Sequence, residues 1–370
     1  MNFETYNEEV YSLLKELCAI PAPSHHEEKR AQYCKAYFDT LGFDKVYIDE
    51  AKNVVCEWNC EGSDAITVFA AHTDTVFPDT EPMPYYEKDG KAFCPGVCDD
   101  TASVAILMVA AKHLKSLGRA PKHGLLFVAN SCEEGLGNLK GTRELMKNYE
   151  GRISSFISFD SDLDIIHDSC VGSHRYEVEV LTEGGHSFGA FGNENAIANL
   201  AKIATKIYEI EVPKLEGTKT TYNVGTIEGG TSVNTIAQSA KMLCEYRSDN
   251  VDCLEYMKAR FEAIFKEVEN EKVKVNVTLV GNRPCARMKD PSAQIALSNT
   301  CKSISEKLIG MPVTSVSAST DCNVPLSLGI PSVAVGVWKG HGCHTREEWL
   351  ELESLKPGLR VAIDLMESFL

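Results

Sequence analysis

Acidic and imidazole side chains come directly after three short apolar segments of the chain, or in the loop between the first two. In chain order these side chains are His72, Asp74, Asp99, Asp100, Glu133, Glu134 and Asp160. Imidazole and carboxylate groups, without thiolate, suit zinc, cobalt or manganese. Carboxylates held close together repel one another and are costly to bury unless cations compensate them. If the segment ends meet in the fold, the sequence therefore predicts a divalent metal site there.

Each of these residues also has a plainer explanation when it is taken alone. His72 could be a hydrogen-bonded core histidine, and the aspartates could cap helices. Glu133-Glu134 could be a solvated pair on a loop. None of these explanations accounts for the recurrence of such residues at successive segment ends. A metal site also needs one more neutral donor, and His341 and His344 near the C-terminus are the candidates.

The three apolar segments have the length of buried strands. They cover residues 65–71, 125–129 and 153–159, and they lack the strict alternation of a half-exposed strand. Residues 101–117 are apolar nearly all round and end at Gly118, which predicts a helix that crosses between the first two strands. Alternating strands and helices predict an α/β domain with a mostly parallel sheet. The loops after the strands of such a sheet converge on one crevice, which would bring the polar residues together.

Further elements are predicted on both sides of these strands. Residues 7–19 predict a helix that ends before Pro21, and Ser24 with Glu27 resembles a capping box that opens a second helix. The strand and helix rhythm returns after residue 290 and continues to the C-terminus.

The middle of the chain follows a different pattern. Its expected elements are strands at 176–181, 220–227, 240–246 and 273–280 and helices at 195–210 and 252–267. This β-α-β-β-α-β order is that of the ferredoxin-like α+β arrangement. We therefore expect one α/β domain built from residues 1–172 and 286–370, interrupted by an inserted α+β domain at residues 173–285.

The charge of the chain argues against some classes of partner. Acidic residues outnumber basic ones by 53 to 37, which gives the 370-residue chain a formal net charge of −16. Such a charge repels phosphate backbones and anionic lipids, so we expect no nucleic acid and no membrane as partner. The longest apolar stretch, residues 104–111, is far too short to span a bilayer. The N-terminal sequence MNFETYNEEV has no basic or apolar leader pattern, which predicts a cytoplasmic protein.

The fourteen cysteines are expected to be reduced and to pack as small apolar side chains. The pairs Cys56/Cys60 and Cys94/Cys98 do not have the spacing of zinc knuckles, so they predict no cysteine-based metal site. Cys98 and Cys132 stand directly beside the acidic residues and could make the protein sensitive to oxidation.

Several motifs together resemble one enzyme family. HTD after an apolar strand, GVCDD opening a helix, EEG after the next strand and SFDSD after the third are similar to the dinuclear-zinc metallopeptidases. That family includes peptidase T, bacterial glutamate carboxypeptidase, succinyl-diaminopimelate desuccinylase and aminoacylase. HTREEWLELESL resembles its final histidine segment, and GGHSFGAFGNENAI resembles its interface-histidine segment. The resemblance covers nearly the whole chain, and its pattern is nearest to the peptidase T-like branch.

The resemblance implies two divalent metal ions per chain, with zinc expected and cobalt or manganese as alternatives. The implied ligands are His72, Asp99, Glu134, Asp160 and His344. Asp99 would bridge the two ions, and the peptide bond between Asp99 and Asp100 is expected to be cis. Asp74 would orient His72 through its second ring nitrogen. Glu133 would act first as general base and then as general acid.

The resemblance also implies roles for the inserted domain, as a lid and as the contact of a homodimer. His186 would reach the active site of the neighbouring subunit and stabilise the oxyanion there. Asn234 and Arg247 would hold the carboxylate or carbonyl of the substrate, for which a guanidinium group is geometrically suited. The alternative for Arg247 is a salt bridge to Asp249 or another nearby acid.

The implied function is that of a metal-dependent exopeptidase acting on short peptides. Aspartate at position 160 resembles the aminopeptidase and dipeptidase members, which favours a di- or tripeptide aminopeptidase. The alternative is an N-acyl amino acid deacylase or another small-amide hydrolase that uses the same metals. A non-catalytic binding protein would be expected to lack a ligand or Glu133, and this chain has them all. The side-chain preference, the native metal and the end of the peptide that is attacked stay open.

Overall fold

The computed structural model describes residues 3–370, apart from the side chain of Leu136. The chain forms two compact units. One holds the residues up to Cys170 together with Arg287–Leu370, and the other holds Val171–Ala286. We call them the large unit and the inserted unit and describe each by itself.

Within the described residues, the large unit contains an eight-stranded sheet in the order β1-β2-β6-β3-β7-β16-β8-β15. Its strands are β1 (Lys45–Ile48), β2 (Val54–Trp58), β3 (Ile66–His72), β6 (Gly124–Asn130), β7 (Ile153–Phe159), β8 (Ile165–Cys170), β15 (Thr314–Ala318) and β16 (Ser332–Val335). The neighbours β6, β3, β7 and β16 run parallel, and β15 runs parallel to β8. The other pairings, β1 with β2, β2 with β6 and β8 with β16, are antiparallel. The predicted α/β class with a mostly parallel sheet is confirmed.

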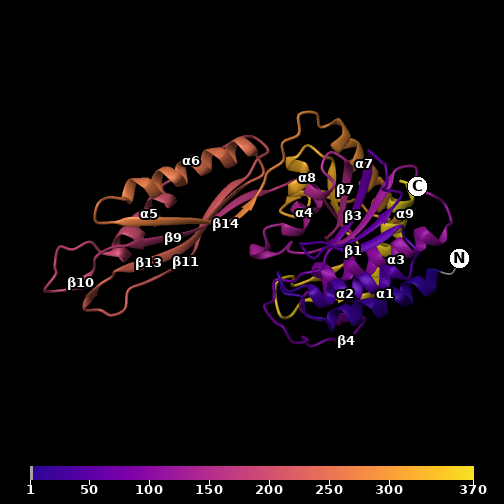
Figure 1. Cartoon of the computed structure of the whole chain (residues 1–370), viewed down its shortest axis with the longest axis horizontal. Coiled ribbons are helices and arrows are strands. Elements are labelled where there is room, and N and C mark those ends of the chain that lie inside the picture. Colours follow the sequence, from indigo (N-terminus) through magenta and orange to yellow (C-terminus); the bar gives the residue numbers. More distant parts are fainter. Residues whose placement is uncertain (1–2) are drawn as a thin grey trace. The chain divides into compact units, whose positions relative to one another are not determined.

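Helices cover both faces of this sheet. They are α1 (Phe3–Cys18), α2 (Glu28–Asp39), α3 (Ser103–Ser116), α4 (Lys140–Asn148), α7 (Ser292–Ile309), α8 (Asn323–Ser327) and α9 (Leu355–Glu367). α3 contacts α1 and α9, and α7 contacts α9, so these helices form one layer. α4 and α8 contact each other on the other side of β3 and β7 (Figure 1). Every residue from Ser103 to Ala111 is buried, which explains why α3 is apolar nearly all round.

A second sheet in the large unit was not predicted from the sequence. Its order is β17-β18-β5-β4, with β4 (Tyr86–Lys88), β5 (Lys91–Phe93), β17 (Gly340–His341) and β18 (Trp349–Glu351). Strands of two or three residues are too short to show a hydrophobic period. The antiparallel pairing of β5 with β18 brings the loop after β5 beside the segment between β17 and β18.

The inserted unit is an antiparallel sheet with two helices. Its main strands are β9 (Gly172–Leu181), β11 (Thr220–Gly229), β13 (Ser239–Ser248) and β14 (Lys274–Arg283), in the sheet order β11-β13-β9-β14. The helices α5 (Ala196–Tyr208) and α6 (Val251–Val268) contact each other and share an apolar core with β9 and β13. Asn195 and Asn250 cap the two helices through their side-chain oxygens. A short pair, β10 (Gly185–His186) and β12 (Thr235–Ile236), completes the unit.

The expected capping box at Ser24 and Glu27 is wrong. α2 begins at Glu28, and no side chain caps its first turn. The Ser24 hydroxyl instead donates to the Asp74 carboxylate at 2.7 Å, and Oε1 of Glu27 accepts the backbone N–H of Cys132 at 3.2 Å. Tertiary partners on the strand-end loops therefore compete successfully with the local capping motif.

None of the helices formed by residues 3–370 is both long and apolar enough to cross a membrane.

Candidate metal centre

The ends of β3, β6 and β7 lie at one edge of the large sheet. His72, the last residue of β3, is paired in register with Asn130, the last residue of β6. Glu133 and Glu134 follow β6 in the next loop, and Asp160 follows β7 directly. Because these strands run parallel, polar side chains from distant parts of the sequence lie together at this edge of the sheet.

Asp99 lies between two imidazole rings. Its Oδ1 is 2.9 Å from Nε2 of His72, and its Oδ2 is 3.1 Å from Nε2 of His344. Nε2 of His344 is also 3.2 Å from Oε1 of Glu134. The peptide bond between Asp99 and Asp100 is cis. A carboxylate that faces a different histidine with each oxygen has the arrangement of a bridging ligand.

The donor atoms form three overlapping groups, in each of which one donor atom per residue lies within 4.8 Å of the others. These groups are His72, Asp100 and Asp160; His72, Glu133 and Glu134; and Asp99, Glu134 and His344. The five residues expected as ligands therefore gather at one site, joined by the contact between His72 and Asp99.

His341 does not belong to these groups. It lies in β17, and its ring packs against Trp349 with centroids 6.2 Å apart. His344 lies beyond this strand with a positive φ of 66°. Of the two histidines in this segment, the structure places only His344 against the carboxylates.

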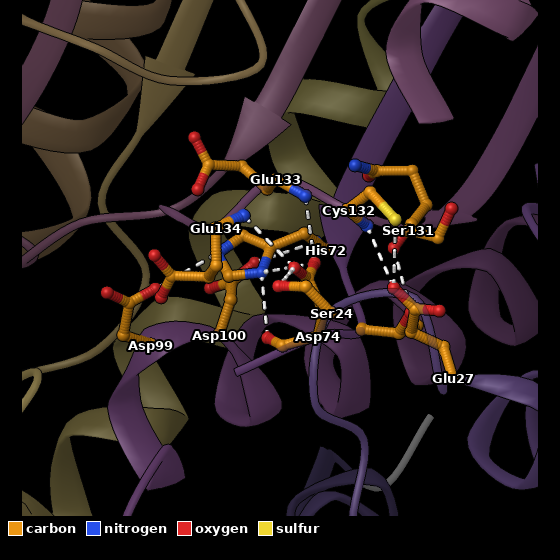
Figure 2. Close-up of polar contacts among 12 residues, drawn as sticks. Ser24, Glu27, His72, Asp74, Asp99, Asp100, Ser131, Cys132, Glu133 and Glu134 are labelled. Atoms are coloured by element: carbon orange, nitrogen blue, oxygen red, sulfur yellow. Dashed lines mark hydrogen bonds and ion pairs between the residues drawn. The ribbon is translucent and has the colours of Figure 1, made fainter. Parts of the chain in front are cut away.

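Asp74 holds the loop that carries the two glutamates. Its Oδ1 accepts the backbone N–H of Glu133 at 2.9 Å, and its Oδ2 accepts that of Glu134 at 3.0 Å (Figure 2). Nδ1 of His72 is 3.1 Å from the main-chain oxygen of Asp74 and 3.5 Å from its carboxylate. Asp74 thus fixes Nδ1 of His72 mainly through its carbonyl group and leaves Nε2 for Asp99.

The cluster carries more negative charge than its surroundings can compensate. Burial, followed by repulsion from Asp99, raises the pKa of Asp160 to about 7. Hydrogen bonds to Asp99 and Glu134 raise the pKa of His344 to about 11. Burial opposes a charge on His72, but Asp100 and the other nearby carboxylates raise its pKa well above the usual value. The carboxylates therefore favour protons on both imidazoles, and the pKa values of Asp100 and Glu134 are raised along with that of Asp160, mainly by burial.

This donor set fits divalent cations. Neutral imidazole and ionised carboxylate are the forms that bind a metal, and binding releases the protons that such groups otherwise hold. Cations would compensate the same negative charge that raises the pKa of Asp160 and His344. Nitrogen and oxygen donors without thiolate suit zinc, cobalt or manganese.

Glu348 fixes the loop that carries Asp99, a role that sequence reasoning missed. Its Oε2 accepts the N–H of Gly96 at 2.8 Å, and its Oε1 accepts those of Cys98 and Asp99 at 2.7 and 3.1 Å. Glu348 is 1% exposed, and burial raises the pKa of its carboxyl group to about 7. The only sequence signal was its place in the HTREE segment that carries His344.

Glu27 and Asp321 are two more buried acids that support the site. Besides the N–H of Cys132, Oε1 of Glu27 lies 3.2 Å from the Cys132 sulfur. Burial raises the pKa of the Cys132 thiol to about 12, which keeps it protonated. Asp321 accepts hydrogen bonds from Asn130, at 2.6 Å, and from Thr142.

The side chains of the three candidates in the inserted unit form hydrogen bonds with groups close by in the sequence. Nδ1 of His186 accepts the backbone N–H groups of Phe188 and Gly189, both at 3.3 Å. The side chain of Asn234 is exposed, and its Oδ1 accepts the hydroxyl of Ser232. Arg247 forms a two-armed ion pair with Glu245 at 2.8 and 3.1 Å. The acid that pairs with Arg247 is therefore Glu245 and not Asp249.

Comparison with known proteins decides the family. The model of peptidase family M20/M25/M40 matches residues 68–368, which is most of the chain. The chain belongs to this family. It is therefore a hydrolase of metallopeptidase type, and the resemblance inferred from its motifs is confirmed. A peptidase M20 domain-containing protein of Schizosaccharomyces pombe is 29% identical over 62% of this chain and 58% of that protein. The chain thus spans little more than half the length of that relative.

Solved structures show the same fold. The aminopeptidase PepT from Bacillus cereus superposes with a TM-score of 0.76 at 22% identity, over 98% of both chains. A dinuclear metal-binding peptidase of the M20 family from Bacillus subtilis gives a TM-score of 0.66 at 14% identity. The superposition covers 98% of the present chain and 99% of the Bacillus subtilis chain. At these identities the likeness concerns the fold alone.

Proposed function

We propose that the protein is a metal-dependent exopeptidase that removes the N-terminal residue from di- and tripeptides. The observation that carries the proposal is the Asp99 carboxylate between His72 and His344, with Glu133 in the neighbouring loop. Two divalent ions, zinc or else cobalt or manganese, would be held by His72, Asp99, Glu134, Asp160 and His344.

Glu133 is the proposed proton carrier. Bound ions would polarise the scissile carbonyl and acidify the attacking water. A carboxylate beside that water can take its proton and pass it to the leaving amine. Asp74 accepts the backbone N–H of Glu133 and so fixes the main chain from which this carboxyl group extends. Asp74 thereby positions both His72 and the proton carrier.

The charge of the site favours a substrate with a free α-amine. Burial first, and repulsion from the Asp99 carboxylate second, raise the pKa of Asp160, so acidic side chains crowd the end of β7. Carboxylates that the bound ions leave uncompensated attract an ammonium group, whereas an N-acyl group brings no positive charge. Aspartate at position 160 is also the residue that resembles the aminopeptidase and dipeptidase members.

Three residues of the inserted unit are the proposed substrate binders. Because Nδ1 of His186 accepts two hydrogen bonds, the proton of the neutral ring lies on Nε2. That N–H can donate to an oxyanion that develops in the transition state. Arg247 and Asn234 are proposed to hold the far carboxylate of a short peptide, with Arg247 exchanging part of its pairing with Glu245 for the substrate.

We further propose that the inserted unit is the interface of a homodimer and lends His186 to the partner. Phe188, Phe191 and Val233 are 89%, 91% and 102% exposed, and they lie in the loops next to β10 and β12. Large apolar side chains exposed together favour a protein contact. His186 belongs to the same pair of strands, so a contact there would carry it to a second chain.

The test compares a tripeptide, its N-acetylated form and its C-terminal amide, each with added zinc, cobalt or manganese. N-acetylation should abolish cleavage because it removes the ammonium group. Amidation should mainly raise KM through the lost anchor at the far end. Faster hydrolysis of the acetylated peptide would contradict the proposal and support the N-acyl amino acid deacylase instead.

A further inference from the structure

Two thiols lie between the loops that carry Asp99 and His344. Cys98 directly precedes Asp99, and Cys343 directly precedes His344. The sulfur atoms of Cys98 and Cys343 lie within 4.8 Å of each other and of a Glu348 oxygen. The pairing of β5 with β18 holds these two loops side by side.

Exposure distinguishes this pair from the other cysteines. All fourteen cysteines fall within the described residues, and thirteen of them are buried while Cys343 is partly exposed. Cys18 and Cys94 are a second pair of neighbouring thiols, but both are buried, at 4% and 2% exposure. Only the pair at the metal centre combines a neighbouring thiol with access from solvent.

Glu348 serves the loop more than the two thiols. Its oxygens accept the N–H groups of Gly96, Cys98 and Asp99. A metal bound by the two thiols and this carboxylate would compete with these hydrogen bonds, which favours a reaction between the thiols. A bond between the two sulfurs needs no third ligand.

We propose that Cys98 and Cys343 are a modification site for peroxides, at which they close to a reversible disulfide. A peroxide oxidises the accessible Cys343 thiol to a sulfenic acid and is itself reduced to water or to an alcohol. The Cys98 thiol then attacks that sulfur, the S–S bond forms, and the sulfenic oxygen leaves as water. For hydrogen peroxide the balance is two thiols and one peroxide giving one disulfide and two waters.

The disulfide changes the metal centre through the peptide backbone. Sulfur atoms in a disulfide are about 2.05 Å apart, so the two cysteines must shift toward each other. The Cys98 thiol also loses the hydrogen bond that it donates to the carbonyl oxygen of Trp349 at 3.2 Å. Because Asp99 and His344 are the next residues, oxidation displaces two of the residues proposed to bind metal.

The experiment treats the metal-loaded full chain with hydrogen peroxide and maps disulfides without reduction. Trypsin releases residues 92–112, which hold Cys94 and Cys98, and residues 340–346, which hold Cys343. The variant Cys94→Ala makes the assignment unique and is the matched control, since it removes one thiol of the buried pair. The expected result is a cross-link between the two peptides, a loss of two titratable thiols from fourteen, and full reversal by dithiothreitol.

Variants separate the modification from its consequence. Cys343→Ala and Cys98→Ser should each abolish the cross-link, whereas Cys94→Ala should form it as the unaltered chain does. Bound metal should fall at least about tenfold on oxidation and return on reduction, because ligand geometry controls metal affinity. A missing cross-link, or a cross-link between other cysteines, would overturn the proposal. A cross-linked protein that keeps its metal would overturn the displacement of Asp99 and His344. Both readouts are independent of which substrate the enzyme hydrolyses.

Discussion

The large unit and the inserted unit present their candidate residues in opposite ways. In the large unit, His72 and Asp99 are held by each other and by buried backbone contacts, and their carboxylate neighbours have shifted pKa values. In the inserted unit, His186 and Asn234 are exposed, and the hydrogen bonds of their side chains reach only groups within a few residues. The fold of the large unit alone arranges His72 and Asp99. His186 and Asn234 would act on a substrate or a second chain, which must bind first.

This difference separates two physical requirements. Carboxylates can be buried together only if the fold fixes them and a cation compensates them, so the large unit must be built tightly around the site. A residue that serves a substrate or a second chain must stay exposed until that partner arrives. The apolar side chains beside His186 are consistent with this second requirement.

Removing the metal should have the largest effect on activity, and the structural change should be confined to the large unit. Chelation should reduce peptide hydrolysis to the background rate, and readdition of zinc should restore it. Metal at about 1,000 times its dissociation constant should stabilise the fold by about 4 kcal/mol. Hydrogen exchange should rise at residues 97–102 and 131–134 on chelation and stay unchanged in β9. Active enzyme with no metal by elemental analysis would contradict the proposed centre.

Glu133 and Glu134 provide the next contrast, because they are neighbours with different proposed roles. Glu133→Gln should keep its metal and lose about 10²–10⁴-fold in kcat, since only the proton carrier is removed. Glu134→Gln should lose metal as well as activity. Metal content measured beside kcat distinguishes the two variants. The reverse pattern would exchange the two roles.

His186 tests whether the inserted unit acts on a second chain. His186→Ala should lose about 10²–10³-fold in kcat if the imidazole stabilises an oxyanion. Mixed with Glu133→Gln subunits, it should recover about a quarter of the normal activity, because half of randomly mixed dimers are mixed and each has one intact site. Each variant alone is the control. Demonstrably mixed dimers without recovery would place His186 in its own chain or outside catalysis.

Sequence patterns predicted the strands and helices whose apolar pattern extends over many residues. The buried strands β3, β6 and β7 and the helix α3 follow from apolar runs, and their order predicts convergence of the loops. The strands β5 and β18 are too short for such a pattern, although their pairing places His344 beside Asp99. The roles of Glu348 and Glu27 were missed because their partners are backbone N–H groups. Almost every residue has such a group, so the sequence does not indicate which ones pair with a carboxylate.

The smallest predicted effect concerns Glu348, which acts on the site only through the backbone. Glu348→Gln replaces one acceptor oxygen with an amide that faces the N–H groups of Gly96 or of Cys98 and Asp99. A buried donor without an acceptor costs about 1–3 kcal/mol, so the unfolding temperature should fall. Metal affinity should fall about 10–100-fold, as for other residues that orient ligands.

The neighbouring residue offers a matched control for this prediction. Glu347 is exposed, so Glu347→Gln removes the same charge from the same segment without touching the Asp99 loop. If both variants lowered metal affinity equally, the loss would be a general effect of charge and Glu348 would have no positioning role. If only Glu348→Gln does so, and saturating metal restores its kcat, then the geometry of the centre depends on the buried hydrogen bonds of the large unit. The large unit would then be shown to hold its site in place before any substrate or second chain arrives.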